Sequence, residues 1–349
     1  MQRCQITLTQ LNQNTVAGSE VLLTILVRIL SCPRPTSEEL LCAAAESLSS
    51  AILVSSDAGT QSRRAAVTAL FGSIPQGGFL VAPFAHAASD CSWEKSAHSL
   101  ANLAYVLTCE EVDVFAKCEL PGCSEMIDLL LRIQSHPSHS VSVTALEAWL
   151  ALQDVPTAER HPDMAGPLFG RIVDLLIPRI SYSASFTTWE DEVDLDPQEF
   201  AEMRRLVGDV LVSAYFLLRV SFVDQVVGAI SADKTRWTVT ESALFCLTSV
   251  AREVCARVKA RAGGSSVAED KKATAHRLVH LMEELCTGGA DAAAARHELV
   301  LSAVCTFTGA FAPVWNVVCS PDAILGLFAF LRDSMRVSGA TGAAGKSSR

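Results

Sequence analysis

Apolar residues recur at intervals of three and four positions along nearly the whole chain, and this spacing most constrains the fold. Within 197–220, for example, Phe200, Met203, Val207 and Val210 fall on one face of an α-helix. No segment shows a convincing alternation of apolar and polar residues, the pattern typical of a half-buried strand. We therefore predict an all-α protein.

Similar stripes predict a series of helices separated by breaks rich in Pro, Gly and Ser. Two of the predicted starts carry capping residues. Asp196 is the expected N-cap of one helix, with Pro197 at its first position and Glu199 three residues beyond the cap. Thr238 and Glu241 have the spacing of a capping box. The predicted helices are 20–30, 37–54, 62–71, 93–107, 123–134, 140–152, 164–178, 197–220, 238–258, 270–285, 292–311 and 321–335.

These helices pair into units of roughly forty residues, which is the length of HEAT and armadillo repeats. A bundle is the alternative arrangement. A single apolar stripe on each helix, with no helix apolar all round, favours a stacked array. The five tryptophans lie at spacings that approximate the same period: Trp93, Trp149, Trp189, Trp237 and Trp315. We predict one right-handed α-solenoid over 1–335, followed by a disordered tail over 336–349.

Composition limits the class of partner. Hydrophobic residues make up 50% of the chain and aromatic residues only 6%, which suits many small helix–helix contacts. The net charge of −10 argues against nucleic acid, because binding to phosphates requires a basic face. An acidic surface is better matched to a basic protein.

Cysteines and the longest uncharged segment both favour a protein outside the secretory pathway and outside the membrane. The twelve cysteines are scattered singly, without a C-x-x-C pair, so we expect reduced thiols in the cytosol or nucleus. The segment 299–319 carries no charge, but it contains Pro313, which divides it into a helix and a short connector. A buried helix is therefore expected there, and no membrane span.

Motifs for catalysis and metal binding are absent from the sequence. The tail GATGAAGKSSR has five residues between Gly339 and Gly345, where a phosphate-binding loop needs four. His276 and His280 have zinc-ligand spacing, but position 277 is Arg where a zinc protease has Glu. We expect no catalytic residue, no metal and no cofactor, and we do not expect an enzyme.

An acidic strip before the helix at 197 is the candidate partner-binding site. Clustered carboxylates on a connector would steer a basic partner, and the tryptophan beside them would supply an aromatic anchor. The alternative is a solvated loop whose last acid caps the next helix. Arg204 and Arg205 either pair with these acids at the surface, which is favoured, or face a ligand. The strip candidates are Trp189, Glu190, Asp191, Glu192, Asp194 and Asp196.

Four ordered blocks carry a resemblance to a known family. They are SEMIDLLLRIQSHPSHSVSVTALEAWLALQDV at 124–155, DPQEFAEMRRLVGDVLVSAYFLL at 196–218, RWTVTESALFCLTSVAREV at 236–254 and HELVLSAVCTFTGAF at 297–311. In this order they resemble the importin-β (karyopherin-β) superfamily, most closely the transportin branch that imports SR-type splicing factors. The resemblance covers about 80–331.

The resemblance implies a superhelical transport receptor that moves between nucleus and cytoplasm. Such receptors hold a basic or SR-type protein cargo on an inner surface, contact nucleoporins and respond to the GTP-bound form of Ran. The family's N-terminal Ran-binding repeats are not recognisable in 1–71, so we expect this chain to correspond to a middle part of the family's length. A HEAT-type scaffold unrelated to transport is the alternative function.

Overall fold

The computed structural model describes residues 16–55, 60–192, 196–233, 235–260, 265–287, 297–319, 322, 324–330 and 332. Within these ranges the secondary structure is helical and contains no strand, which confirms the all-α prediction. The tail predicted at 336–349 lies outside the described residues. Two compact units, Met1–Ala165 and Gly166–Arg349, make up the chain, and each is described separately. The single array over 1–335 stays a prediction.

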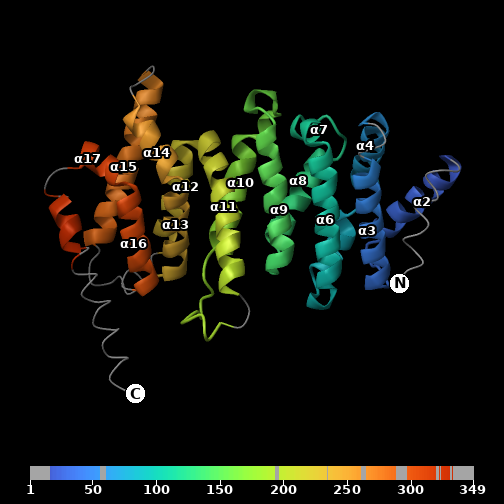
Figure 1. Cartoon of the computed structure of the whole chain (residues 1–349), viewed down its shortest axis with the longest axis horizontal. Helices are drawn as coiled ribbons and strands as arrows, with labels where there is room; N and C mark the ends of the chain where they lie inside the picture. Colours follow the sequence, from blue (N-terminus) through green and yellow to red (C-terminus); the bar gives the residue numbers. More distant parts are fainter. Residues whose placement is uncertain are drawn as a thin grey trace. The chain divides into compact units, whose positions relative to one another are not determined.

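In the first unit, helices of successive pairs pack on one another (Figure 1). Helix α6 packs on α3 on one side and on α9 on the other, while α4 packs on α8. The helices are α2 (Val16–Ile29), α3 (Glu38–Ser55), α4 (Thr60–Gly77), α5 (Val81–Ala87), α6 (Glu94–Glu110), α7 (Val112–Ala116), α8 (Cys123–Gln134) and α9 (His139–Ala151).

Buried aromatic side chains fill the space between these helices. Trp149 is fully buried, and its indole nitrogen donates a hydrogen bond to the side-chain oxygen of Gln134. Phe71 and Phe115 pack with their ring centroids 6.1 Å apart. Helix α8 begins after Gly122, which has a φ of 85°. A Cβ at this position would lie 2.6 Å from the Phe71 carbonyl oxygen, so both the backbone conformation and the close contact require glycine.

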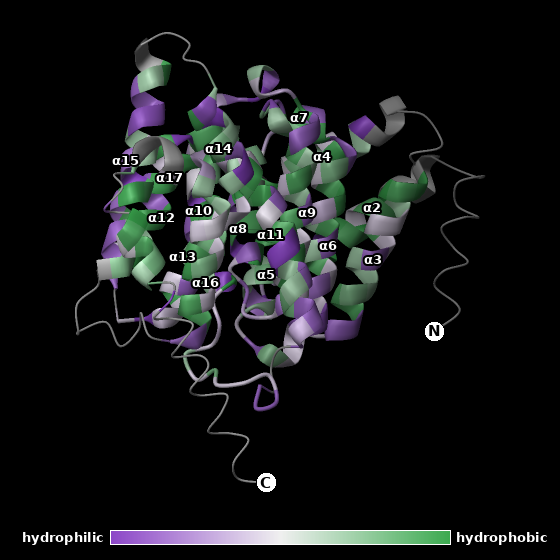
Figure 2. Ribbon diagram, turned by 60° about the vertical axis from the view of Figure 1, so that its left-hand side comes forward, coloured by the Kyte–Doolittle hydropathy of each residue, from purple (hydrophilic) through white to green (hydrophobic). Residues whose placement is uncertain are grey.

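The second unit repeats this neighbour-to-neighbour packing. Helix α13 lies between α11 and α16, and α12 lies between α10 and α15. In Figure 2 individual helices carry both hydrophobic and hydrophilic residues, as the sequence stripes predict. The helices are α10 (Gly166–Arg179), α11 (Pro197–Leu218), α12 (Val220–Ala232), α13 (Trp237–Ser249), α14 (Ala251–Lys259), α15 (Ser265–Thr287), α16 (Glu298–Ala310) and α17 (Ala312–Val318). Within each unit the arrangement is compatible with a helical solenoid.

Several boundaries differ from the sequence prediction. The predicted α8 is found without change, but α5, α7 and α12 were not predicted. The helix predicted at 238–258 is two helices, separated at Val250. Pro313 lies in the first turn of α17, so the expected short connector is itself a helix.

No helix in the part of the chain that the structure describes has the length and apolar content needed to cross a bilayer.

Candidate partner-binding site

A cluster of aromatic rings fixes the connector that precedes α11. We call Tyr182, Phe186, Trp189, Phe200 and Trp237 the aromatic anchor. The Tyr182 ring lies 4.6 Å from Phe186, 4.9 Å from Phe200 and 5.8 Å from both tryptophans, centroid to centroid. Trp189 also packs against Phe186 at 5.0 Å and Phe200 at 5.6 Å. The anchor therefore joins the connector to the first turns of α11 and α13.

The side chain of Arg204 packs directly against this anchor. Its guanidinium carbon lies 4.9 Å from the Tyr182 ring centroid and 4.4 Å from that of Phe200. The same group donates to the Ile180 carbonyl oxygen and to both carboxylate oxygens of Glu241. With side chains only 11% and 8% exposed, Arg204 and Glu241 form a largely buried, bidentate ion pair that links α11 to α13.

This pairing corrects the capping-box prediction for α13. The N-cap residue of α13 is Arg236, and it makes no side-chain cap hydrogen bond. Thr238 is buried inside the helix, and Glu241 uses its carboxylate on Arg204. The local spacing was correct for a capping box, but a partner 37 residues away binds the carboxylate.

At the far side of the anchor, Trp237 stacks on His297. Their ring centroids are 3.6 Å apart and their planes differ by 6°. His297 is the N-cap of α16, where its Nδ1 accepts a hydrogen bond from the backbone N–H of Leu299. Burial lowers the pKa of His297, against a smaller opposing effect of Glu298 and Glu241. The neutral imidazole that the cap needs is thereby favoured.

The acidic strip lies in the chain between two residues of the anchor, beginning at Trp189 and ending before Phe200. Glu190 and Asp191 are exposed, whereas Trp189 and Glu192 are half-buried. The Asp191 carboxylate accepts hydrogen bonds from the hydroxyls of Thr188 (2.8 Å) and Thr187 (2.9 Å), and these bonds lower its pKa. The strip thus presents carboxylates on a connector whose neighbouring rings are packed.

Asp196 has the structural role that the sequence predicts. Its Oδ1 accepts hydrogen bonds from the backbone N–H groups of Gln198 (2.7 Å) and Glu199 (3.2 Å), and Pro197 occupies the first turn of α11. Asp194 lies outside the described residues.

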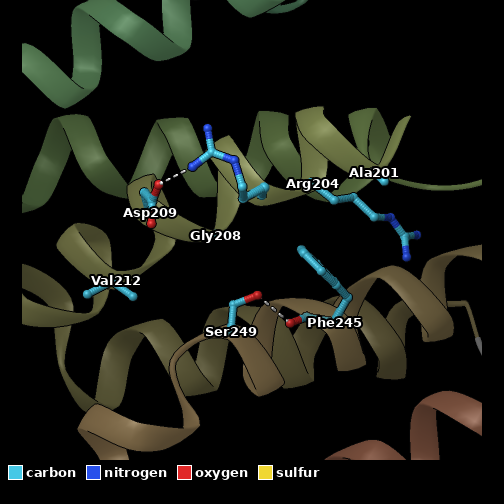
Figure 3. Close-up of a pocket in the computed structure, with 8 residues that line it drawn as sticks. Ala201, Arg204, Gly208, Asp209, Val212, Phe245 and Ser249 are labelled. Atoms are coloured by element: carbon cyan, nitrogen blue, oxygen red, sulfur yellow. Dashed lines mark hydrogen bonds and ion pairs between the residues drawn. The ribbon is translucent and has the colours of Figure 1, made fainter. Parts of the chain in front are cut away.

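A shallow groove of about 480 Å³ runs between α11 and α13 (Figure 3). Arg204, Gly208 and Val212 line it from α11, and Phe245 and Ser249 line it from α13. Figure 3 shows the Phe245 ring on the side of the groove opposite Arg204. The groove is therefore continuous with the aromatic anchor through Arg204.

Arg205, also at the groove, is bound by its own helix. Its guanidinium pairs with Glu202 at 2.7 Å and with Asp209 at 3.4 Å, one turn away on either side. The predicted surface pairing with the strip is therefore not found for the strip acids that the structure describes: Arg204 pairs with Glu241 in a largely buried position, and Arg205 pairs on its own helix. Because the groove carries both signs of charge, charge alone selects no occupant for it.

The structure brings Trp189 and Arg204 into one cluster, whereas sequence reasoning treated them as separate candidates. It also adds Tyr182, Phe186 and Glu241, which were not predicted as site residues. The spacing of Trp189 and Trp237 in the sequence was the signal that could have pointed to this cluster, since both rings contact Tyr182.

Burial shifts the pKa values of titratable side chains in this region. Burial raises the pKa of the Cys246 thiol, next to the ion pair, to about 12, which disfavours the thiolate form that a nucleophile needs. Burial also raises the pKa of Tyr182. What the region offers is exposed carboxylates beside packed rings, an arrangement suited to holding a protein partner.

A scan against protein-family models and a search of curated proteins found no match to the chain. What the fold defines is therefore a class: an α-helical protein whose helices pack neighbour to neighbour.

Proposed function

We propose that this chain is a nuclear transport receptor of the importin-β type, built from right-handed HEAT-like hairpins, that binds a basic or SR-type protein as cargo. In this proposal it moves between nucleus and cytoplasm, responds to Ran, contacts nucleoporins and catalyses no reaction. The resemblance of the four sequence blocks and the neighbour-to-neighbour helix packing support it.

The observation that carries the binding role is the acidic strip on its aromatic anchor. Phe186 is 8% exposed, and the rings of Tyr182, Phe186 and Phe200 pack against Trp189. The connector is therefore held in place next to the exposed Glu190 and Asp191. A surface already ordered loses less conformational entropy on binding than a mobile one. Its carboxylates would draw in a cationic segment and speed its association.

The first test measures binding of the purified chain to Ran loaded with a non-hydrolysable GTP analogue, with Ran–GDP in parallel. A receptor of this class prefers the GTP form. Equal binding to both forms, or none, would contradict the Ran-dependent part of the proposal and favour a HEAT-type scaffold that bridges proteins outside transport.

A second test addresses the strip itself. Reversing Glu190, Asp191 and Glu192 to lysine should weaken binding of a fluorescent peptide of alternating arginine and serine by about tenfold. The matched control reverses three exposed glutamates of the first unit, Glu46, Glu125 and Glu147. Equal affinities of the two variants, with helical circular dichroism intact, would rule out the strip as the cargo contact.

A further inference from the structure

The corner between α11 and α12 contains a backbone conformation that its residue disfavours. Arg219 alone joins the two helices, at φ 57° and ψ −122°. Glycine adopts such a conformation at little cost, but a residue with a Cβ is strained there. Strain of this kind is concentrated at functional sites, where the side chain is needed in its place. The long cationic side chain at this corner therefore calls for an explanation.

The guanidinium of Arg219 lies over two rings. Its central carbon is 5.6 Å from the ring centroid of Tyr215 and 5.0 Å from that of Phe216. Within the described ranges no carboxylate forms an ion pair with it. Its neighbours differ: Arg257 pairs with Asp270 and Arg277 with Asp224, each at 2.7 Å.

Below Arg219 lies a buried phenol. Tyr215 is 1% exposed, and the Arg219 side chain interacts with its hydroxyl. Burial raises the pKa of Tyr215, while the guanidinium groups of Arg257 and Arg219 act in the opposite direction. Two cations thus face this phenol, and Asp270, the acid nearby, is taken by Arg257.

Two further features make the corner a place for an anion. Helix α12 begins there without a side-chain cap, and its dipole adds positive potential at this end, although the N–H group of Phe222 in its first turn donates to the Arg219 carbonyl oxygen. Phe216, on the last turn of α11, is 52% exposed and offers an apolar face next to the guanidinium. Asp224, further along α12, pairs with Arg277.

We propose that the α11–α12 corner binds an acidic peptide segment of a partner protein, with one carboxylate on Arg219 and an adjacent apolar side chain on Phe216. A guanidinium fork matches the two oxygens of a carboxylate. An exposed aromatic ring beside an arginine is the composition of an interface hot spot. This site takes the opposite charge to the acidic strip, so it goes beyond the cargo contact proposed above and does not depend on it.

A carboxylate is favoured over a phosphate-rich ligand by the charge balance. One unpaired guanidinium and one helix N-terminus can neutralise a single negative charge. A nucleic acid or an anionic membrane presents many phosphates to a chain whose net charge is −10.

The test uses a fluorescent peptide of alternating glutamate and leucine, with a glutamine-and-leucine peptide as its neutral counterpart. The glutamate peptide should bind the full chain, and the neutral peptide should bind at least about tenfold more weakly, the loss expected for one charge-assisted contact. Arg219→Gly should reduce binding of the glutamate peptide to the same extent. This substitution also relieves the backbone strain, so the variant should be no less stable than the parent.

Matched variants separate the guanidinium from charge in general. Arg252 on α14 is exposed, and Arg252→Ala removes the same charge without touching the corner, so it should leave binding unchanged. Arg219→Lys keeps the charge but loses the fork, and an intermediate affinity is expected. A serine-phosphorylated peptide is included as competitor. The proposal is overturned if the parent does not bind the glutamate peptide or binds the neutral one equally. It is also overturned if Arg219→Gly binds like the parent, or if the phosphorylated peptide binds more tightly.

Discussion

Arg204 is the residue on which the candidate site depends, because it meets polar and apolar requirements in one place. Its guanidinium is packed by the rings of Tyr182, Phe200 and Phe245, and its donors reach Ile180 and Glu241. Removal of either Arg204 or Glu241 would leave the charge of the other uncompensated in a largely buried position. The neighbouring Arg205 has a side chain that is 59% exposed and partners on its own helix.

This contrast gives a prediction at the residue scale. Arg204→Ala should lower the free energy of unfolding by about 3 kcal/mol, because Glu241 is left buried and unpaired. Arg205→Ala removes the same side chain one position along α11 and should cost less than about 1 kcal/mol, as an exposed pair does. Urea denaturation followed by circular dichroism measures both.

A second substitution checks the cause. If the lost stability reflects the unpaired Glu241, then Arg204→Met combined with Glu241→Leu should recover most of it, since no buried charge remains. Equal losses for Arg204→Ala and Arg205→Ala would show instead that the ion pair between α11 and α13 contributes little.

The start of α11 shows how much of the residue scale is predictable from sequence. Asp196 and Pro197 were predicted as N-cap and first position, and both are found there, because capping depends only on residues within one turn. Glu241 was wrongly assigned to a cap, since its true partner is set by tertiary packing. Local pattern cannot distinguish these two cases.

At the scale of elements, apolar spacing predicted the long helices and missed the short or weakly marked ones. Helix α12 was overlooked because VSFVDQVVGAISA is rich in β-branched residues and has no capping residue at its start. Its buried stripe, Phe222, Val223, Val226 and Ile230, packs between α10 and α15. The break between α13 and α14 at Val250 was invisible because the apolar stripe continues through it.

Helix α16 carries the element-scale prediction, which concerns pH. His297 caps α16 through Nδ1, and only the neutral ring can accept that hydrogen bond. Because burial lowers its pKa in the folded state, the unfolded chain binds the proton more readily. The stabilisation is therefore present at neutral pH and is lost as pH falls below the ordinary histidine range towards the lowered pKa.

The comparison is between the parent and His297→Asn, which keeps an N-cap side chain but does not titrate. Between about pH 7.5 and pH 5.5, the parent should lose of the order of 1 kcal/mol more unfolding free energy than the variant, the typical worth of an N-cap. Tryptophan fluorescence should follow the change, since Trp237 stacks on this imidazole. Parallel pH profiles for the two proteins would refute the role of His297.

At the scale of the whole molecule, the sequence predicted the fold class more securely than the site. Helical periodicity is repeated many times along the chain, so an error in one segment leaves the class unchanged. The candidate site depends on contacts between α11, α13 and the connector, such as Tyr182 with Trp237, that no periodicity encodes. For the site, composition indicated only that the chain is negatively charged, with a net charge of −10.

The negative net charge of the chain leads to the last prediction, which concerns the rate of association with a basic partner. Raising salt from about 50 mM to about 500 mM screens this charge, because the screening length falls to a few ångströms. The association rate of the arginine–serine peptide should then fall by about tenfold or more, as expected for electrostatic steering. Stopped-flow fluorescence measures this dependence.

Reversal of Glu190, Asp191 and Glu192 should flatten the salt dependence of the association rate, because these carboxylates lie at the proposed contact. Reversal of Glu46, Glu125 and Glu147 changes the net charge equally and should leave most of the slope. If both variants flattened it alike, the net charge of the chain, and not the acidic strip, would govern the encounter.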